Sequence, residues 1–531
     1  MSLEGIEPAE TNGSLTRSVV HGAAWLGISQ VFTQVFHLVS MVFLARLLLP
    51  DDFGITAMAA IITSLVSEVL SLGFNRAIIQ RKEVTPSHLS TAFWIQWSLG
   101  IVFCLVTVAV SPLVASFFNN EMVGPVLAVA SISFVIAPLG AVHGALLRKK
   151  LDFLRFTVAD IGAAITYLAV AVPMAFAGFG VWSIVVGGLA SASCQVIIRW
   201  IMCRWRPSFT FSRSSFRDMR SFGFSVTGIS LIQYINRRLD YLIIGRFLSA
   251  ANVGFYNLGL RTLNYPVGGL RFIISRVGLP AFSQVQDEDV RLRRGFLKSV
   301  QWVSIIGLPI FTGMAIVAPE LIRVAFGEQW TPAIVPMQLL CAASAASLMS
   351  ETVPSLVFSK GKPGAYLKLA IARVIFLVPG LLLGAQFGIE GVAISVATIS
   401  VIFTVARQIL ASRLIGIGFK TYLVVMRHAA IGCIIMAIVL LAFRYATSLF
   451  DFPDIPLLIS SVLLGVIVYF ITLKLIRTDA LDEMTELALE IIKPPVRSVM
   501  ARIPLLRKGV PATPNTPHKR VQNEEGGSTN A

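Results

Sequence analysis

The sequence predicts an all-α integral membrane protein with about 14 transmembrane helices, and three observations lead to that fold class. Hydrophobic residues make up 55% of the 531 residues and charged residues only 14%, whereas soluble domains carry about a quarter charged residues. The mean hydropathy is +0.77. Long apolar runs follow one another along most of the chain, and basic residues gather between alternate runs.

Fourteen apolar runs are long enough to cross a bilayer, since a spanning helix needs about 20 mainly apolar residues. Basic residues concentrate in the linkers after even-numbered runs, whereas the linkers after odd-numbered runs hold only Arg46, Arg246 and Arg444. Cytoplasmic loops carry such an excess of lysine and arginine, so we expect both termini in the cytoplasm and no nucleic-acid partner, despite the net charge of +16. The runs lie near 23–46, 53–75, 89–117, 123–147, 157–177, 181–203, 222–246, 253–275, 299–326, 333–358, 364–385, 389–411, 428–447 and 457–476.

Two short segments repeat at a nearly constant offset. Residues 45–54 (ARLLLPDDFG) align with 245–254 (GRFLSAANVG), and 180–185 (GVWSIV) align with 390–395 (EGVAIS). Both pairs fall at equivalent outer loops, and six spans per repeat keep the two halves in one orientation. The sequence therefore predicts two six-helix bundles related by a parallel repeat, plus two extra C-terminal helices.

The chain accordingly divides into six expected parts. The outer linkers are short, so no extracytoplasmic domain is expected. The five cysteines show no CxxC spacing, so we predict neither a disulfide nor a metal site. The parts are a cytoplasmic N-terminus (1–22), an N-lobe of spans 1–6 (23–203), a cytoplasmic linker (204–221), a C-lobe of spans 7–12 (222–411), spans 13–14 (412–477), and a cytoplasmic tail (478–531) that is amphipathic over Leu481–Ile492 and then disordered.

Six strings within roughly the first 410 residues resemble a known family of membrane proteins. They are LARLLLPDDFGITAMA (44–59), LGFNRAIIQRKE (72–83), GALLRKKLDFLRF (144–156), GFGVWSIVVGGL (178–189), RRLDYLIIGRFLSAANVGFYNLGLR (237–261) and FGEQWTPAIVPMQLL (326–340). In this order they resemble the polysaccharide transporter family, the Wzx-type flippases, nearest the branch for colanic acid and succinoglycan-type exopolysaccharides. The family shares a superfamily with the multidrug and toxin extruders and the lipid II flippase, which implies two six-helix lobes around a central cavity.

The resemblance implies a transporter, not an enzyme, in a bacterial inner membrane. Its implied cargo is an undecaprenyl-pyrophosphate-linked oligosaccharide, moved from the cytoplasmic to the periplasmic leaflet by alternating access, for exopolysaccharide or lipopolysaccharide biosynthesis. No cofactor is implied; a polysaccharide polymerase and co-polymerase are candidate partners besides membrane lipids. Two alternatives stay open: an ion-coupled multidrug antiporter of the same superfamily and, less favoured, a membrane-embedded polysaccharide polymerase or ligase.

Charged residues within spans are the candidates for a cavity site, because a charge in hydrocarbon is costly and is retained for a function. Arginine suits a diphosphate, since its planar fork gives bidentate hydrogen bonds. Arg261 is the leading candidate, about 10 Å inside the outer end of the eighth span at 1.5 Å per residue. The substrate-binding candidates are Arg261, Arg237, Arg238, Arg271, Arg46, Arg246, Gln30, Gln34 and Asn264, and the ion-coupling candidates are Asp240, Glu68 and Glu351.

Each candidate also has a structural interpretation. Arg261 is open to an ion pair with Asp240. Asp240 shares a helix face with Arg237, and a structural pair between these two is favoured over ion coupling. Arg46 and Arg246 stand at matched repeat positions near the outer ends of spans, where snorkelling to the surface explains them. The same choice between a functional and a packing role applies to Gln30, Gln34, Glu68, Glu351 and Arg373.

Overall fold

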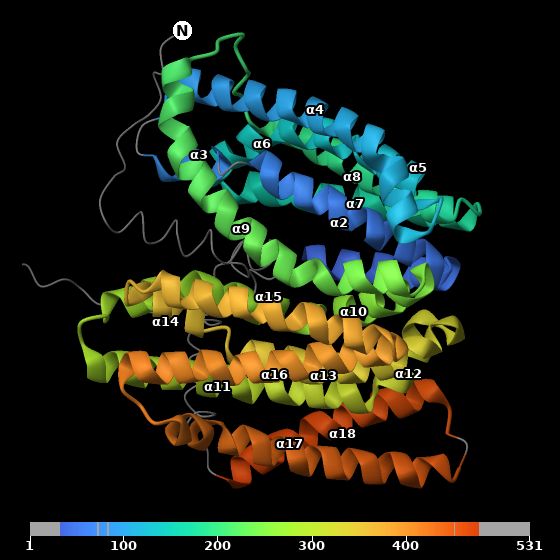
Figure 1. Ribbon diagram of the computed structural model, residues 1–531. Helices are drawn as coiled ribbons and strands as arrows, with labels where there is room; N and C mark the ends of the chain where they lie inside the picture. Colours follow the sequence, from blue (N-terminus) through green and yellow to red (C-terminus); the bar gives the residue numbers. More distant parts are fainter. Residues whose placement is uncertain (1–31, 72–73, 82–83, 451, 477–531) are drawn as a thin grey trace, which may run out of the picture. The chain divides into compact units, whose positions relative to one another are not determined.

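The structure is a computed structural model that describes residues 32–71, 74–81, 84–450 and 452–476 (Figure 1). Every regular element in these ranges is a helix. The helices are a first helix Phe32–Leu47, α2 Pro50–Ser71, α3 Phe74–Gln80, α4 Pro86–Phe118, α5 Val123–Ala130, α6 Ser133–Lys149, α7 Phe153–Phe176, α8 Val181–Met202, α9 Arg213–Phe247, α10 Ala250–Gln284, α11 Asp289–Ile316, α12 Ala318–Phe326, the 3-10 helix η1 Glu328–Ala333, α13 Ile334–Met349, α14 Val353–Ser359, α15 Pro363–Ala385, α16 Gly388–Ile415, α17 Phe419–Ser448 and α18 Asp454–Leu475.

Eleven helical segments of the described chain are long and apolar enough to cross a membrane, and each coincides with one of the predicted spans. Three predicted spans are not among them. The first, 23–46, is described only from residue 32 onward. The spans 222–246 and 253–275 fall on the helices α9 and α10. The all-helical membrane fold is confirmed, and the count of fourteen stays a prediction.

Several helices are longer than the apolar runs that predicted them. Helix α9 begins at Arg213, so half of the expected linker 204–221 is helical. Helices α10 and α11 likewise cover most of the stretch 276–298. The reason is that hydropathy marks only the part of a helix that hydrocarbon covers, whereas its hydrogen bonds continue into the polar ends. The predicted N-terminus 1–22 and tail 478–531 lie outside the described residues.

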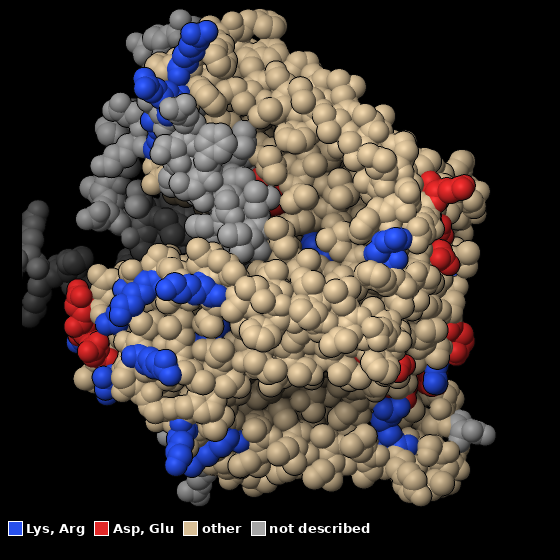
Figure 2. All heavy atoms as spheres, in the orientation of Figure 1, with Lys and Arg blue, Asp and Glu red and all other residues tan. Residues whose placement is uncertain are grey.

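Charge is distributed along the helices as a membrane protein requires. In Figure 2, uncharged side chains cover the middle of the visible face, and most charged side chains lie toward the two ends of the helices. Acidic side chains are visible at the turn from α10 to α11 with Lys and Arg on the helices beside it, and the opposite end also carries both Asp or Glu and Lys or Arg. The arginines that remain at mid-helix, described below, are therefore exceptions to the pattern.

The two halves of the chain meet through repeat-equivalent glycines. We call the helices from the first helix to α8 the N-lobe and α9 to α16 the C-lobe. A Cβ added to Gly54 of α2 would overlap the backbone carbonyl of Ala250, and a Cβ added to Gly254 of α10 would overlap that of Pro50. Each residue lies 200 positions from its counterpart. The contact is reciprocal, as a repeat predicts, and only glycine permits it.

An aromatic side chain fills the space beside this contact. Trp330 of η1 is fully buried, and its ring meets Phe53 of α2 and Phe255 of α10 edge-on at 5.2 and 5.9 Å. Its indole nitrogen donates to the carbonyl of Ala45, at 2.7 Å. The two lobes are thus packed together at one end of the first helix, α2 and α10. The loop charges predict that this end lies on the outer side of the membrane.

The last two helices pack beside the C-lobe. Helix α17 packs on α11 and on α18, and the hydroxyl of Tyr469 donates to the carbonyl of Ile305, at 2.9 Å. At the predicted outer end, Arg444 pairs with the buried Glu320 at 2.6 Å. These contacts attach α17 and α18 to the C-lobe helices α11 and α12 and leave the interface between the lobes to the repeated helices.

Candidate functional site

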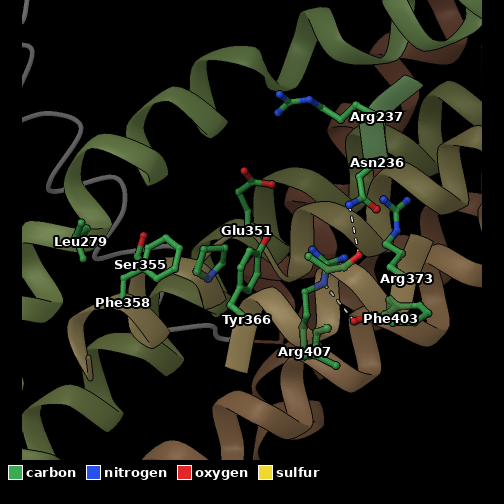
Figure 3. A pocket seen from close by; sticks show the side chains of 13 residues that line it. Asn236, Arg237, Leu279, Glu351, Ser355, Phe358, Tyr366, Arg373, Phe403 and Arg407 are labelled. Carbon is green, nitrogen blue, oxygen red and sulfur yellow. Dashed lines mark hydrogen bonds between the residues drawn. The ribbon is translucent and has the colours of Figure 1, made fainter. Parts of the chain in front are cut away.

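The C-lobe contains a pocket of about 430 Å³ lined by charged side chains from several helices. Arg237 comes from α9, Arg373 from α15 and Arg407 from α16, while Glu351 lies in the turn between α13 and α14. Figure 3 shows these four side chains around one space. The remaining lining residues are Asn236, Leu279, Pro354, Ser355, Phe358, Tyr366, Leu369, Ala370 and Phe403.

Local hydrogen bonds fix the helices that carry the pocket. The amide of Asn236 donates to the carbonyl of Ala370, at 3.3 Å, and so ties α9 to α15. The Nε of Arg407 donates to the carbonyl of Phe403 one turn earlier, at 3.2 Å. Within the part of the chain that the structure describes, the guanidinium of Arg373 makes only a long contact with the hydroxyl of Ser400, at 3.5 Å, and its buried Nε has no hydrogen-bond partner. The pocket therefore offers unused donors on a guanidinium.

The pocket has a surplus of positive charge. Glu351 is the only acid among its lining residues, against three arginines. A second carboxylate, that of Asp240, accepts hydrogen bonds from the hydroxyl of Tyr256, at 2.7 Å, and the backbone nitrogen of Tyr241, at 3.0 Å. Asp240 forms no ion pair with any described residue, so the expected pair with Arg237 is not present. Arg237 lines the pocket instead.

Adjacent arginines on α9 take different roles, as their separation of about 100° around a helix requires. Arg237 is exposed toward the pocket and has no ion-pair partner within the described chain. Arg238 instead lies over the ring of Tyr241, 5.1 Å from its centroid, and hydrogen-bonds the side chain of Tyr234. Arg237 is the member of the pair that is available to a ligand.

Arg261 of α10 lies apart from the pocket and projects toward the N-lobe. Its charge acts on His37 of the first helix and Tyr167 of α7, and also on Tyr265 one turn along α10. The side chain is exposed and makes neither a hydrogen bond nor an ion pair with any described residue. The alternative of an ion pair with Asp240 is therefore wrong. A charge on a helix between the lobes that no described acid pairs with is available to an anion.

Other predicted residues are less available. Arg271 donates to the side-chain oxygen of Asn264, at 2.6 Å, so these two candidates are partners of each other. Gln34 lies close against the backbone of Gly268 in α10, where an added Cβ would come within 2.5 Å of its amide nitrogen. Glu68 acts electrostatically on Tyr234. Gln30 lies outside the described residues.

Arg46 and Arg246 both cross between the lobes, but in different ways. Arg46, near the end of the first helix, donates to the carbonyls of Val324 and, at 3.1 Å, Ala325, which end α12. A cation is favourable there because unpaired carbonyls end a helix. Arg246 lies 5.7 Å from the ring centroid of Phe117 in α4. Neither arginine lines the pocket, and a role in an outer gate stays a prediction.

Two arginines of the pocket, Arg373 and Arg407, were not among the binding candidates that the sequence analysis selected. Arg373 is visible as an isolated charge in an apolar run, but nothing local separates it from a structural arginine. Arg407 lies near the end of its run and is equally well explained as part of the basic inner linker. Charge within a span gave a usable signal for both. The sequence could not predict that both side chains line the same pocket as Arg237 and Glu351.

Comparison with known proteins identifies relatives across most of the chain. The family model described as polysaccharide biosynthesis protein matches residues 43–335. The lipopolysaccharide biosynthesis protein WzxC of Escherichia coli (strain K12) is 28% identical over 414 residues, covering 77% of this chain and 84% of the relative. The succinoglycan biosynthesis transport protein ExoT of Rhizobium meliloti (strain 1021) is 21% identical over 476 residues, covering 89% and 96%.

A solved structure has the same fold. The lipid II flippase MurJ, in an inward closed conformation, superposes with a TM-score of 0.69 over 84% of this chain and 97% of that one. The sequence identity is 13%, so the likeness concerns the fold alone. It covers both lobes and agrees with the predicted two-lobe architecture.

Proposed function

Because the chain belongs to the family of polysaccharide biosynthesis proteins, we propose that it is a flippase for a lipid-linked oligosaccharide. Its cargo is a sugar repeat unit on a polyprenyl diphosphate, which it moves from the cytoplasmic to the periplasmic leaflet of a bacterial inner membrane. Support comes from relatives named for lipopolysaccharide and succinoglycan biosynthesis and from a flippase with the same fold.

The observation that carries the proposal is Arg261, on a helix between the lobes, which forms no ion pair with any residue that the structure describes. A flippase breaks no covalent bond and has to lower the cost of moving a diphosphate across hydrocarbon. An arginine without a carboxylate partner supplies charge-assisted, bidentate hydrogen bonds for that purpose. We propose that Arg261 contacts the diphosphate and that His37 and Tyr167 add polar contacts from the other lobe.

Alternating access fits the way in which the lobes meet. In this structure α2 and α10 touch at the ends near Pro50 and Ala250, on the side that the loop charges predict to be outer. The C-lobe pocket is built beside the α13–α14 turn and the last turns of α10, toward the predicted cytoplasmic side. We propose that the substrate enters from the cytoplasmic side and that separation of α2 from α10 releases it outward. A polymerase is the proposed recipient.

Transport in a purified system tests the proposal. The chain in proteoliposomes should move a labelled lipid-linked oligosaccharide and not a cationic dye, and Arg261→Ala should abolish that movement while the protein still inserts. The matched control is Arg294→Ala, which removes an exposed arginine near the start of α11. Transport of the dye alone would favour the multidrug antiporter, and unchanged flipping by Arg261→Ala would remove Arg261 from the diphosphate site.

A further inference from the structure

The C-lobe pocket carries positive charge beyond what the diphosphate contact uses. Arg261 faces the N-lobe, whereas Arg237, Arg373 and Arg407 line a separate space within the C-lobe. We propose that this pocket binds an acidic sugar of the repeat unit, one that bears a carboxylate, and so selects acidic repeat units over neutral ones. The inference rests on the proposed flippase function and names the substrate class for it.

The arginines of the pocket have donors that no described residue uses. Among the described residues, the buried Nε of Arg373 has no hydrogen-bond partner, and the only hydrogen bond of its guanidinium is the long one to Ser400. Arg237 pairs with no acid in the described chain. A buried donor without a partner is costly, and a carboxylate satisfies a guanidinium with two parallel hydrogen bonds. The pocket therefore gains most from an anionic ligand.

The rest of the lining suits a sugar ring. Glu351 forms no ion pair with any described residue, so its oxygens can accept hydrogen bonds from sugar hydroxyls. Tyr366 and Phe358 meet at a centroid distance of 5.8 Å and, with Phe403, supply apolar surface for the carbon face of a ring. A volume of about 430 Å³ falls in the range of roughly 300–1,000 Å³ that is typical of small-molecule sites.

Glu351 also distinguishes an acidic sugar from a diphosphate. A diphosphate concentrates charge on neighbouring oxygens and carries no hydroxyl for Glu351 to accept from, so the two anions repel each other. An acidic sugar presents its carboxylate at one edge and hydroxyl donors at the others. The three arginines and the glutamate can then contact different edges of the same ring. This division assigns the diphosphate to Arg261 and the sugar to the C-lobe pocket.

A paired-substrate experiment tests the assignment. The full chain is reconstituted in proteoliposomes with two fluorescent substrates that share the polyprenyl diphosphate and the glycan length. One carries a glucuronic acid residue, and in the other the carboxyl group is reduced to the alcohol. We expect the wild type to flip the acidic substrate at least about tenfold faster than the neutral one, because the free energy of one charge-assisted hydrogen bond corresponds to a factor of about ten or more. Arg373→Gln and Arg237→Gln should bring the ratio of the two rates close to one.

The outcomes separate this inference from the function on which it rests. A wild-type ratio near one, or pocket variants that keep the wild-type ratio, overturns the pocket assignment and leaves the flippase intact. If the wild type moves neither substrate, the flippase proposal and the inference both fail. Arg237 is exposed and unpaired among the described residues, so Arg237→Gln decides between the outcomes even where Arg373→Gln does not fold. Arg294→Gln should keep the wild-type ratio.

Discussion

The two lobes share a repeat but treat their buried charges differently. In the N-lobe, Asp160 of α7 pairs with Arg199 of α8 at 3.2 Å and accepts from Gln195 at 3.0 Å. In the C-lobe, the corresponding helices α15 and α16 bring Arg373 and Arg407 to the pocket without a paired acid. The N-lobe pair thus balances two opposite charges locally, whereas Arg373 and Arg407 form no ion pair with any acid of the described residues.

Aromatic contacts strengthen the contrast. The guanidinium groups of Arg148 and Arg199 lie 5.0 and 5.4 Å from the ring centroid of Phe156. Arg199 is only 13% exposed. These contacts hold both cations in place within the N-lobe, and such contacts contribute about 0.5–2 kcal/mol each. No comparable ring contact is present for Arg373 or Arg407 in the described residues.

The largest expected effect comes from the reciprocal glycines, where the lobes should behave alike. Gly54→Ala and Gly254→Ala each place a methyl group on a backbone carbonyl of the other lobe, and overpacking of this kind costs about 1–3 kcal/mol. Contact between the two lobes at the outer ends of α2 and α10 is then less favourable, so polymer export in cells should fall by about tenfold. The two variants should have similar effects because the contact is symmetric.

Gly188→Ala in α8 is the control, because an added Cβ there meets nothing within 4 Å. It should leave both export and the amount of protein in the membrane unchanged. Full export by Gly54→Ala would contradict the reciprocal contact. A defect in only one of the two glycine variants would show that the repeat is not functionally symmetric.

The second prediction concerns the paired and unpaired arginines, where the lobes should differ. Asp160→Ala leaves Arg199 uncompensated and should lower the free energy of unfolding by about 1–3 kcal/mol, less than for a fully buried pair because Asp160 is partly exposed. Removing an arginine that has no acid partner, by Arg373→Gln, should change stability by less than about 1 kcal/mol. Thermal unfolding of the purified protein measures both.

A double-mutant cycle sharpens this second comparison. Removing Arg199 together with Asp160 should recover part of the lost stability, since no uncompensated charge remains. If Asp160→Ala proves harmless, the N-lobe pair is not structural. A loss of stability in Arg373→Gln larger than that in Asp160→Ala would reverse the contrast between the lobes.

The smallest effect is expected at the matched arginines near the outer ends. Arg46→Ala removes hydrogen bonds to two carbonyls at the end of α12 and should cost about 1–2 kcal/mol. Arg246→Ala removes only a contact with the ring of Phe117 and should cost about 0.5–1 kcal/mol. The melting temperatures of the two variants give the comparison. Equal shifts in melting temperature would mean that the stability contributed by each arginine follows from its matched position in the repeat and not from its different contacts.

Much of the fold was predictable because it depends on local properties of the chain. Hydropathy over about 20 residues identifies segments that are apolar enough to cross the hydrocarbon core of a bilayer. It located eleven spans that the structure contains. The offset of 200 residues predicted a repeat, and Gly54 and Gly254 meet the opposite lobe as a repeat requires. The family predicted from short strings is confirmed by the match over residues 43–335.

The sequence by itself thus determined a helical membrane protein with a repeated plan and a set of arginines at membrane depth. Only the tertiary structure decided which of these arginines are available: Arg271 donates to Asn264, whereas Arg261 forms no ion pair with any described residue, because Tyr256 and the backbone of Tyr241 already hydrogen-bond the carboxylate of Asp240 elsewhere. The physical reason is that the partner of a side chain depends on the rotation and packing of helices far apart in sequence. Composition and spacing within one helix do not specify those contacts.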